Sequence, residues 1–447
     1  MQRIMGEGES LGVLPVRFLG EWKGHMKVKS ISMLQFFFAA FFLFVCCQNG
    51  APKSAENQAD LDEKEIPIDF MRGFDASTVD FLEECGAVYR DENGIERDVF
   101  FILKSHGVNW IRLRIWHTPS KNAAPGDNDL MRTIRMAKRI KSYGLQFLLD
   151  FHYSDTWADP GSQRRPAQWD GCATINELAD AIHSYTEETL LSLKENDCLP
   201  DMVQLGNEIN SGLCTLLSDG SASRIPISSG EQNDEGNKNL VILLKAASEA
   251  VNAVDPAIKR MIHLASDGSC VDSSWWFERI NGFDFECIGL SYYVFENHGT
   301  ILQLRENISN LKHHYNKDIV VCETSWAWTF DKYGNDSQSN YVWYDKGVEA
   351  AMRVSDVENS ALKELQFIKY TDKKCLEASV KNQEVVFRAI IEATVRAGGC
   401  GVFYWGGDWI CDPNGSVDNN WENQALFDLT GNCLSSMNAF NQGFSMN

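Results

Sequence analysis

Several features that would identify a class of protein are missing from this sequence. The thirteen cysteines include no Cys-x-x-Cys pair and no spacing typical of a zinc finger, so no metal site built on cysteine is expected. Basic residues are scarce, because 41 Lys and Arg stand against 62 Asp and Glu and leave a net charge of −21. Nucleic acids and anionic membranes attract basic surfaces, so we expect neither as a partner.

Long apolar runs are scarce too. The apolar run Phe36–Val45 has ten residues, which are too few to cross a bilayer. It lies between the basic start at Met26 and the pair Cys46 and Cys47, so we interpret residues 1–50 as an export leader whose true start is Met26. The two cysteines resemble a bacterial lipoprotein signal; the alternative is a plain signal peptide. We therefore expect export, with lipid anchoring at the bacterial cell surface or outer membrane, or else secretion.

The segment after this leader, residues 51–69, is polar and acidic and has no apolar periodicity. We expect it to be a solvated tether. Several of the remaining cysteines, such as Cys287, Cys322 and Cys400, lie inside apolar runs and are expected to be buried thiols.

Beyond the tether, short apolar runs alternate with helical patterns, without a repeat or a linker. This order predicts a (β/α)8 TIM barrel, a single α/β catalytic domain over residues 70–447 with long loops after its strands. A doubly wound open sheet is the alternative, but the glycine-rich phosphate turn that usually follows its first strand is missing. The expected strands are Phe70–Ser77, Val108–Trp116, Leu145–Ser154, Met202–Asn210, Arg260–Ala265, Cys287–Tyr293, Ile319–Ser325 and Cys400–Trp405.

Two of these strands deliver a glutamate to their C-terminal ends, Glu208 on the fourth and Glu323 on the seventh. The C-terminal rim of a (β/α)8 barrel carries its chemistry. A pair of carboxyl groups there suits glycoside hydrolysis, which needs an acid/base and a nucleophile or a second base. We expect these strands on opposite sides of the ring, with the two side chains facing each other. For either glutamate alone, a solvated charge at the rim is the alternative.

Polar residues near these strand ends are candidates for sugar contacts. Asn207 adjoins Glu208 and is placed to hydrogen-bond a sugar hydroxyl group. Arg112 and Arg114 lie two residues apart on one strand, so they face the same side and at most one is expected at the rim. There it would keep a nucleophilic carboxylate ionised, while apolar walls and the second carboxylate raise the pKa of the acid.

Aromatic residues are abundant, with 13 Trp, 12 Tyr and 25 Phe. Most are expected in the core, but rings at strand ends are candidates for stacking on sugars. A hydrogen-bonded structural role is the alternative for the histidine among them. The candidates at strand ends are His152, with Asp155 and Trp157 in the loop after it, then Tyr292, Tyr293 and Trp405.

These motifs, taken together, resemble glycoside hydrolase family 53, the endo-β-1,4-galactanases. The resemblance extends over about residues 70 to 440, and its most specific run is DFHYSDTWADPG at 150–161. The other matching segments are Arg72–Ser77, Val108–Trp116, Gln163, Pro166–Trp169, Gly206–Ile209, Gly289–Tyr293, Glu323–Ser325 and Asn423–Asp428.

The resemblance implies a (β/α)8 fold and hydrolysis with retention of the anomeric configuration. It implies Glu208 as the acid/base, Glu323 as the nucleophile, and the β-1,4-galactan of type I arabinogalactan and pectin side chains as the substrate. With the strand-end pattern, it leads us to expect substrate contacts from Asp75, Arg112, Arg114, Trp116, His152, Asp155, Trp157, Asn207, Tyr292, Tyr293 and Trp405.

This sequence departs from the family at three loops that shape the sugar subsites. Gly406-Gly407-Asp408 follows Trp405 where the family usually has Glu-Pro, Val294 replaces a frequent Pro, and Leu213–Thr215 replaces Leu-Trp-Pro. These changes affect the expected linkage preference and product length, and leave the two glutamates in place.

No cofactor is expected to be required. A structural calcium ion is an alternative that the resemblance raises, because some bacterial members hold calcium in the loop after strand seven. Asp331, Asn335 and Asp336 offer oxygen atoms there, although their spacing is not the usual one.

The expected partner is a polysaccharide, and we expect a monomer that meets the membrane only through its lipid anchor. Two other functions stay open. One is a related hydrolase acting on another plant β-glycan such as mannan or xylan, and the other is a glycan-binding lipoprotein without activity.

Overall fold

The computed structural model describes residues 63–64, 66–120, 127–227, 234–265, 270–280, 282–296, 298–330, 342–354, 361–410, 422–441 and 444–445. They belong to one compact unit, Gln58–Asn447. The predicted leader, with Met26, Cys46 and Cys47, lies outside the described residues, and so do Asp331, Asn335 and Asp336 of the calcium alternative. No helix in the described ranges has both the length and the apolar character that crossing a membrane requires.

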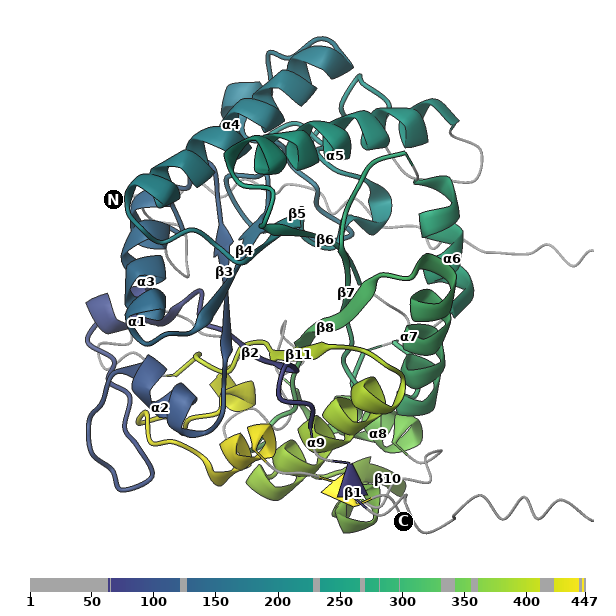
Figure 1. Ribbon diagram of the computed structural model, residues 1–447. Helices are drawn as coiled ribbons and strands as arrows, with labels where there is room; N and C mark the ends of the chain where they lie inside the picture. Colours follow the sequence, from purple (N-terminus) through teal and green to yellow (C-terminus); the bar gives the residue numbers. More distant parts are fainter. Residues whose placement is uncertain are drawn as a thin grey trace, which may run out of the picture. The chain divides into compact units, whose positions relative to one another are not determined.

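Eight parallel strands close into a barrel, which confirms the predicted fold (Figure 1). The ring closes where the last strand pairs with the first, through the partners Gly401↔Met71 and Phe403↔Gly73. The strands in chain order are β2 (Met71–Asp75), β3 (Trp110–Ile115), β4 (Gln146–Phe151), β5 (Met202–Leu205), β6 (Lys259–Ala265), β7 (Cys287–Ser291), β8 (Asp318–Thr324) and β11 (Gly401–Tyr404).

Helices surround this ring in Figure 1 and alternate with the strands along the chain, as the sequence predicts. Local capping explains several starts: the Asp98 side chain caps α2, and Thr174 with Glu177 forms a capping box at α4. The helices are α1 (Val79–Glu84), α2 (Val99–Ser105), α3 (Leu130–Ser142), α4 (Ile175–Glu195), α5 (Asp234–Val254), α6 (Cys270–Arg279), α7 (Ile301–Tyr315), α8 (Tyr344–Arg353) and α9 (Val380–Arg396).

Some elements were not predicted. The helix α1 is absent from the expectations, and so is an antiparallel hairpin of β9 (Phe367–Tyr370) and β10 (Lys373–Leu376). The segment expected to be a tether is not wholly without structure, because β1 (Glu63–Lys64) pairs with β12 (Phe444–Ser445). Short 3₁₀ turns complete the order at Ala167–Trp169, Ile209–Ser211, Ala361–Glu364, Glu422–Gln424 and Ser435–Phe440.

The barrel interior is layered, because alternate residues of each strand point inward. A lower layer is apolar and rich in sulfur, and it is made of Met71, Leu148, Met202, Met261, Cys287, Val320, Cys322 and Phe403. Gly73 and Gly289 leave room for it: a Cβ atom on Gly73 would lie 2.1 Å from the Phe403 ring. On β4, β5 and β6 a polar residue lies two positions after the apolar one, at Asp150, Gln204 and His263, and all three are buried above this apolar floor.

Candidate active site

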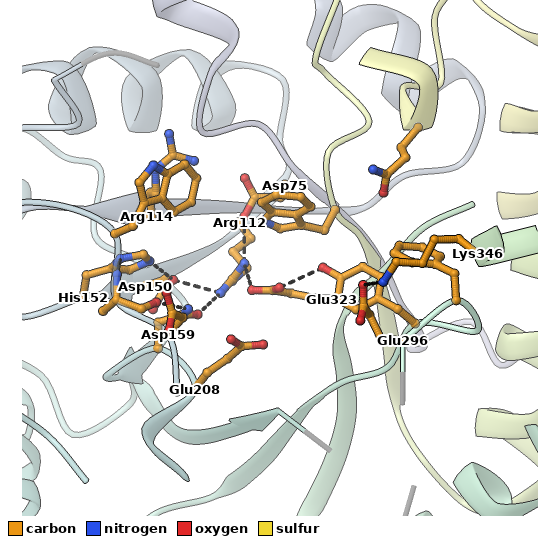
Figure 2. A pocket seen from close by; sticks show the side chains of 17 residues that line it. Asp75, Arg112, Arg114, Asp150, His152, Asp159, Glu208, Glu296, Glu323 and Lys346 are labelled. Atoms are coloured by element: carbon orange, nitrogen blue, oxygen red, sulfur yellow. Dashed lines mark hydrogen bonds and ion pairs between the residues drawn. The ribbon is translucent and has the colours of Figure 1, made fainter. Parts of the chain in front are cut away.

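A cavity of about 450 Å³ opens at the C-terminal ends of the barrel strands (Figure 2). Most of the predicted site residues line it: Asp75, Arg112, Arg114, His152, Trp157, Asn207, Glu208, Tyr293, Glu323 and Trp405. The structure thus brings most of the residues predicted from strand ends and from the resemblance together around one cavity. Sequence reasoning did not single out as contacts the other lining residues, Asp150, Ala158, Asp159, Phe295, Glu296, Lys346 and Gln424.

Glu208 reaches the cavity from a turn and not from a strand. The strand β5 ends at Leu205, five residues before Asn210, the end that was predicted for it. Gly206 then takes φ 94° and Glu208 takes φ 47°, in the left-handed region that non-glycine residues rarely adopt. Such a conformation costs about 1–3 kcal/mol and is typical of sites where geometry serves function.

Glu323 is directed inward by an irregularity in β8. Leu290 of β7 pairs with Val321, but the next residue, Ser291, pairs with Glu323, so Cys322 is an extra residue in the register. A bulge of this kind changes which face the following side chains occupy. As a result Cys322 and Glu323 both face the barrel interior, although they are neighbours in sequence.

The two carboxyl groups lie close together. One oxygen of Glu208, one of Glu323 and a ring nitrogen of His263 all lie within 4.8 Å of one another. The strands β5 and β8 are separated by β6 and β7 in the ring, so they do not lie on opposite sides as we expected. The side chains meet because both point into the interior above the apolar floor. Among the residues that the structure describes, these three side chains lie near enough to one another to hold a cation. Both ring nitrogens of His263, however, already have hydrogen-bond partners.

Arg112 is the central cation of the site and is fully buried. Its guanidinium lies 2.9 Å from Asp75, 2.8 Å from Asp150 and 2.9 Å from Glu323, as Figure 2 shows. It also donates to the Asn207 side-chain oxygen over 2.9 Å. Three carboxylates therefore share one guanidinium, which holds Glu323 in place from the side of the barrel floor.

Arg114 lines the cavity as well, which corrects the expectation that at most one of the two arginines would lie at the rim. Its guanidinium carbon lies 4.1 Å from the centre of the Trp157 ring and 5.0 Å from that of Trp116. The long arginine side chain lets two successive inward positions reach one cavity. Burial lowers the pKa of Arg114 to about 10.

An aromatic wall continues from this arginine. The Trp157 ring lies 6.4 Å from Trp405 and 6.5 Å from Trp409, and Trp405 lies 6.1 Å from Trp409. Trp409 was missed, because it follows the departure from the family at Gly406–Asp408. Trp116 is completely buried and packs against Trp157, but it does not line the cavity, so its position does not match the predicted substrate contact.

His152 is held in one tautomer. Its Nδ1 accepts hydrogen bonds from the Trp116 indole and from the Ala158 backbone, each over 3.1 Å. Its Nε2 must then carry the proton, which it donates to Asp150 over 3.1 Å. Asp150 in turn binds Arg112, so His152 orients the arginine as well as lining the cavity. The position of His152 is therefore compatible with both roles considered for it, a hydrogen-bonded structural role and a place in the cavity wall.

The paired tyrosines point in different directions, as neighbours on an extended segment do. Tyr293 lines the cavity and donates its hydroxyl hydrogen to Glu323 Oε2 over 2.9 Å. Tyr292 is completely buried in the core and donates to the Gly299 carbonyl oxygen. The structure thus places Tyr292 away from the cavity, in contrast to the predicted substrate contact.

Asp155 also lies away from the cavity walls. Its carboxylate accepts hydrogen bonds from the backbone N–H groups of Thr118 (2.8 Å) and Ala167 (2.9 Å). It therefore ties two loops together at the barrel mouth, and the prediction of a substrate contact is not matched by its position.

The two glutamates differ in their surroundings. Burial, and then the negative charge of Glu323, raise the pKa of Glu208 to about 8. Burial also raises the pKa of Glu323, but the Arg112 guanidinium and the Tyr293 hydroxyl group oppose that rise. A single proton shared by the pair is therefore favoured on Glu208, which agrees with the raised pKa predicted for the acid.

One side of the cavity is formed by two residues that no motif in the sequence singled out. Lys346 of α8 forms an ion pair with Glu296 over 2.5 Å, and both line the cavity (Figure 2). No pattern in the sequence connects these two residues, which lie 50 positions apart, Glu296 in the loop after β7 and Lys346 on α8.

Comparison with known proteins adds to this geometry. The sequence pattern described as "Glycosyl hydrolase family 53" matches residues 71–353 and 343–440. An arabinogalactan endo-beta-1,4-galactanase of Cellvibrio japonicus is 32% identical over 81% of this chain and 87% of its own length. An uncharacterized protein of Niallia circulans is 38% identical, over 84% of this chain and 94% of its own. Among solved structures, the GH53 catalytic domain of Ignisphaera aggregans is 35% identical with a TM-score of 0.70, covering 85% of this chain and 98% of that one.

Proposed function

Because this chain belongs to glycosyl hydrolase family 53, we propose that it is a retaining endo-β-1,4-galactanase that uses Glu323 as nucleophile and Glu208 as acid/base. The observation that carries the assignment of roles is the asymmetry of the pair. Glu323 has a guanidinium and a phenol hydroxyl group as partners, which suits a carboxylate, whereas Glu208 has the higher tendency to keep a proton. The proposed substrate is the β-1,4-galactan of type I arabinogalactan, since relatives named galactanases match most of the chain.

The proposed reaction has two displacements. In the first, a Glu323 oxygen attacks the anomeric carbon, the glycosidic C–O bond breaks, and Glu208 gives its proton to the leaving oxygen. In the second, Glu208 takes a proton from water, the resulting hydroxyl bonds to the anomeric carbon, and the ester bond to Glu323 breaks. Two inversions return the original configuration.

The spacing of the carboxyl groups supports retention. Retaining glycosidases hold their carboxyl groups about 5–5.5 Å apart, and inverting enzymes about 6.5–9.5 Å apart, to leave room for a water molecule. The nearest oxygens of Glu208 and Glu323 lie within 4.8 Å. This gap is too small for the water that inversion needs between the carboxylate and the sugar.

A pH profile tests the role of Glu208. Since the pKa of Glu208 is raised to about 8, the group is protonated and competent as an acid below that pH and ionised above it. We expect kcat/KM for galactan to fall about tenfold per pH unit above pH 8. An aryl galactoside with a leaving group that needs no protonation should lack this descending limb. A loss of activity on galactan as the pH rises through 5 would contradict the assignment.

A panel of polysaccharides tests the substrate. We expect residues 51–447 to release short galacto-oligosaccharides from β-1,4-galactan, with far slower release of reducing ends from mannan and xylan. Cleavage of mannan or xylan alone would leave the two glutamates in their roles and replace the substrate. Binding of galactan without cleavage would instead favour a glycan-binding protein.

We also propose that the protein is an exported monomer, anchored by lipid at Cys46 or Cys47, and active without an added cofactor. The support comes from the leader in the sequence. Incorporation of labelled palmitate into wild type, and its loss when both cysteines are replaced by serine, is the expected result; equal labelling of the two would refute the anchor.

A further inference from the structure

A short chain of hydrogen bonds leads from the barrel interior to the acid/base. His263 lies on β6 and Ser291 at the end of β7, and both side chains are completely buried. His263 Nε2 lies 2.9 Å from Ser291 Oγ, and Ser291 Oγ lies 2.6 Å from Glu208 Oε1. Neither residue was singled out by the sequence, and neither lines the cavity wall next to Glu208.

The direction of this chain depends on which nitrogen of His263 carries the proton. The Gln204 side chain settles the first part of the question. Its oxygen accepts from Arg112 Nε over 3.2 Å, and an arginine can only donate, so the amide must turn its NH₂ group the other way. That NH₂ group lies 2.9 Å from His263 Nδ1.

A second donor faces the same nitrogen, because the backbone N–H of Glu208 points at His263 Nδ1 over 3.4 Å. One acceptor is also near, the Asn207 side-chain oxygen at 3.1 Å. A proton on Nδ1 could be donated to the Asn207 oxygen. It would, however, point at the Gln204 NH₂ group, which is nearer and is itself a donor. The Asn207 oxygen is already supplied by Arg112, so it does not need the histidine. The arrangement therefore favours an unprotonated Nδ1 and a proton on Nε2.

The remaining hydrogens follow from this tautomer. His263 Nε2–H donates to Ser291 Oγ, so the Ser291 hydroxyl hydrogen is turned away from the ring. Its nearest acceptor is Glu208 Oε1. Since Oε1 then receives a hydrogen bond, the proton of the neutral Glu208 carboxyl group is left to Oε2. In the described part of the chain Oε2 accepts no hydrogen bond, and the Glu208 side chain lines the cavity.

We propose that His263 and Ser291 are positioning residues that keep the acid proton of Glu208 on Oε2, the oxygen available to the glycosidic bond. This inference rests on the role of Glu208 in the proposed function. If the hydrogen bonds ran in the opposite direction, the Glu208 proton would lie on Oε1, directed at Ser291 and away from substrate. After the first displacement Glu208 is a carboxylate, and the same Ser291 hydroxyl group still donates to Oε1. One arrangement of hydrogens thus serves both steps.

Kinetics with two leaving groups provide the first test. Ser291→Ala and His263→Ala are expected to lower kcat/KM for galactan about 10- to 100-fold, because the acid proton is no longer held in position. They are expected to change kcat/KM for 2,4-dinitrophenyl β-galactobioside less than about threefold, because that leaving group departs without a proton. Ser291→Thr keeps the hydroxyl group and should recover most of the loss on galactan.

Ser436→Ala is a matched control. Ser436 is another completely buried serine that donates a short hydrogen bond, here to Gln383, away from the cavity, and its loss should affect both substrates equally. Equal losses on both substrates for Ser291→Ala would mean that the serine only supports the fold, and would overturn the proposal.

The tautomer itself can be observed without substrate. In ¹⁵N NMR of protein labelled at histidine, the His263 signals, assigned by their absence in His263→Ala, should show a protonated Nε2 and an unprotonated Nδ1. A proton on Nδ1 would overturn the proposal. If wild type cleaved neither substrate, the proposed function would fail. The spectrum would still show which nitrogen of His263 carries the proton, and therefore the direction of the hydrogen bonds.

Discussion

Glu323→Gln is expected to lower kcat on β-1,4-galactan by about 10⁴-fold or more, since an amide cannot form the covalent intermediate. The variant should fold normally. The amide has the same shape, and Asp75 and Asp150 still neutralise Arg112, so the midpoint of thermal unfolding is expected to stay close to that of wild type. Reducing-sugar release and a thermal melt on the same preparation measure both quantities.

A matched control comes from another buried glutamate. Glu392 on α9 is almost completely buried and pairs with Arg396 over 2.6 Å, away from the cavity. Glu392→Gln should keep activity within about threefold of wild type, because it touches no part of the site. If Glu323→Gln kept more than about a hundredth of the activity while remaining folded, the nucleophile would have to be sought elsewhere.

Arg112→Met is expected to have the largest effect on stability. The guanidinium neutralises Asp75, Asp150 and Glu323, all of which are buried, and leaving such charges without a partner costs about 3–5 kcal/mol. Burial raises the pKa of Asp150, but Arg112 together with His152 and His263 holds the pKa below its usual value. Without the arginine Asp150 and Glu323 should take up protons at higher pH, so the deficit in unfolding free energy should shrink as the pH falls.

Arg132→Met distinguishes this effect from the loss of any arginine. Arg132 on α3 also binds three carboxylates, Asp80, Glu84 and Asp127, at 2.5–2.8 Å, but they are partly exposed to water. Water screens such pairs, so the expected cost is about 1 kcal/mol, with activity unchanged. Urea unfolding at pH 7 and pH 5 provides the comparison, and equal costs for Arg112→Met and Arg132→Met would contradict the central place of Arg112.

The fold and the two glutamates could be predicted because they depend on local patterns. Apolar runs that end in polar clusters predicted every barrel strand, and the strand ends led to Glu208 and Glu323. Local irregularities at the strand ends could not be predicted from the sequence. The extra residue Cys322 in β8 depends on pairing with β7, and the left-handed Glu208 depends on how the turn fits the barrel mouth.

Residues that act through others were missed for a related reason. Asp150, Ser291 and His263 lie in ordinary strand sequences, and only the closed ring brings them to Arg112 and Glu208. The pair of Lys346 and Glu296 joins α8 to the loop after β7, and the two sequences carry no sign of each other. Contacts of this kind are set by tertiary packing, which a periodicity does not contain.

The stereochemistry of galactan hydrolysis tests the central claim most directly. In ¹H NMR spectra recorded during the first minutes after enzyme is added to β-1,4-galactan, newly formed reducing ends should appear first as the β-anomer and only later equilibrate with the α-anomer. That result would support the substrate, the two displacements and the close pair of carboxyl groups together. First appearance of the α-anomer would show inversion and contradict the account.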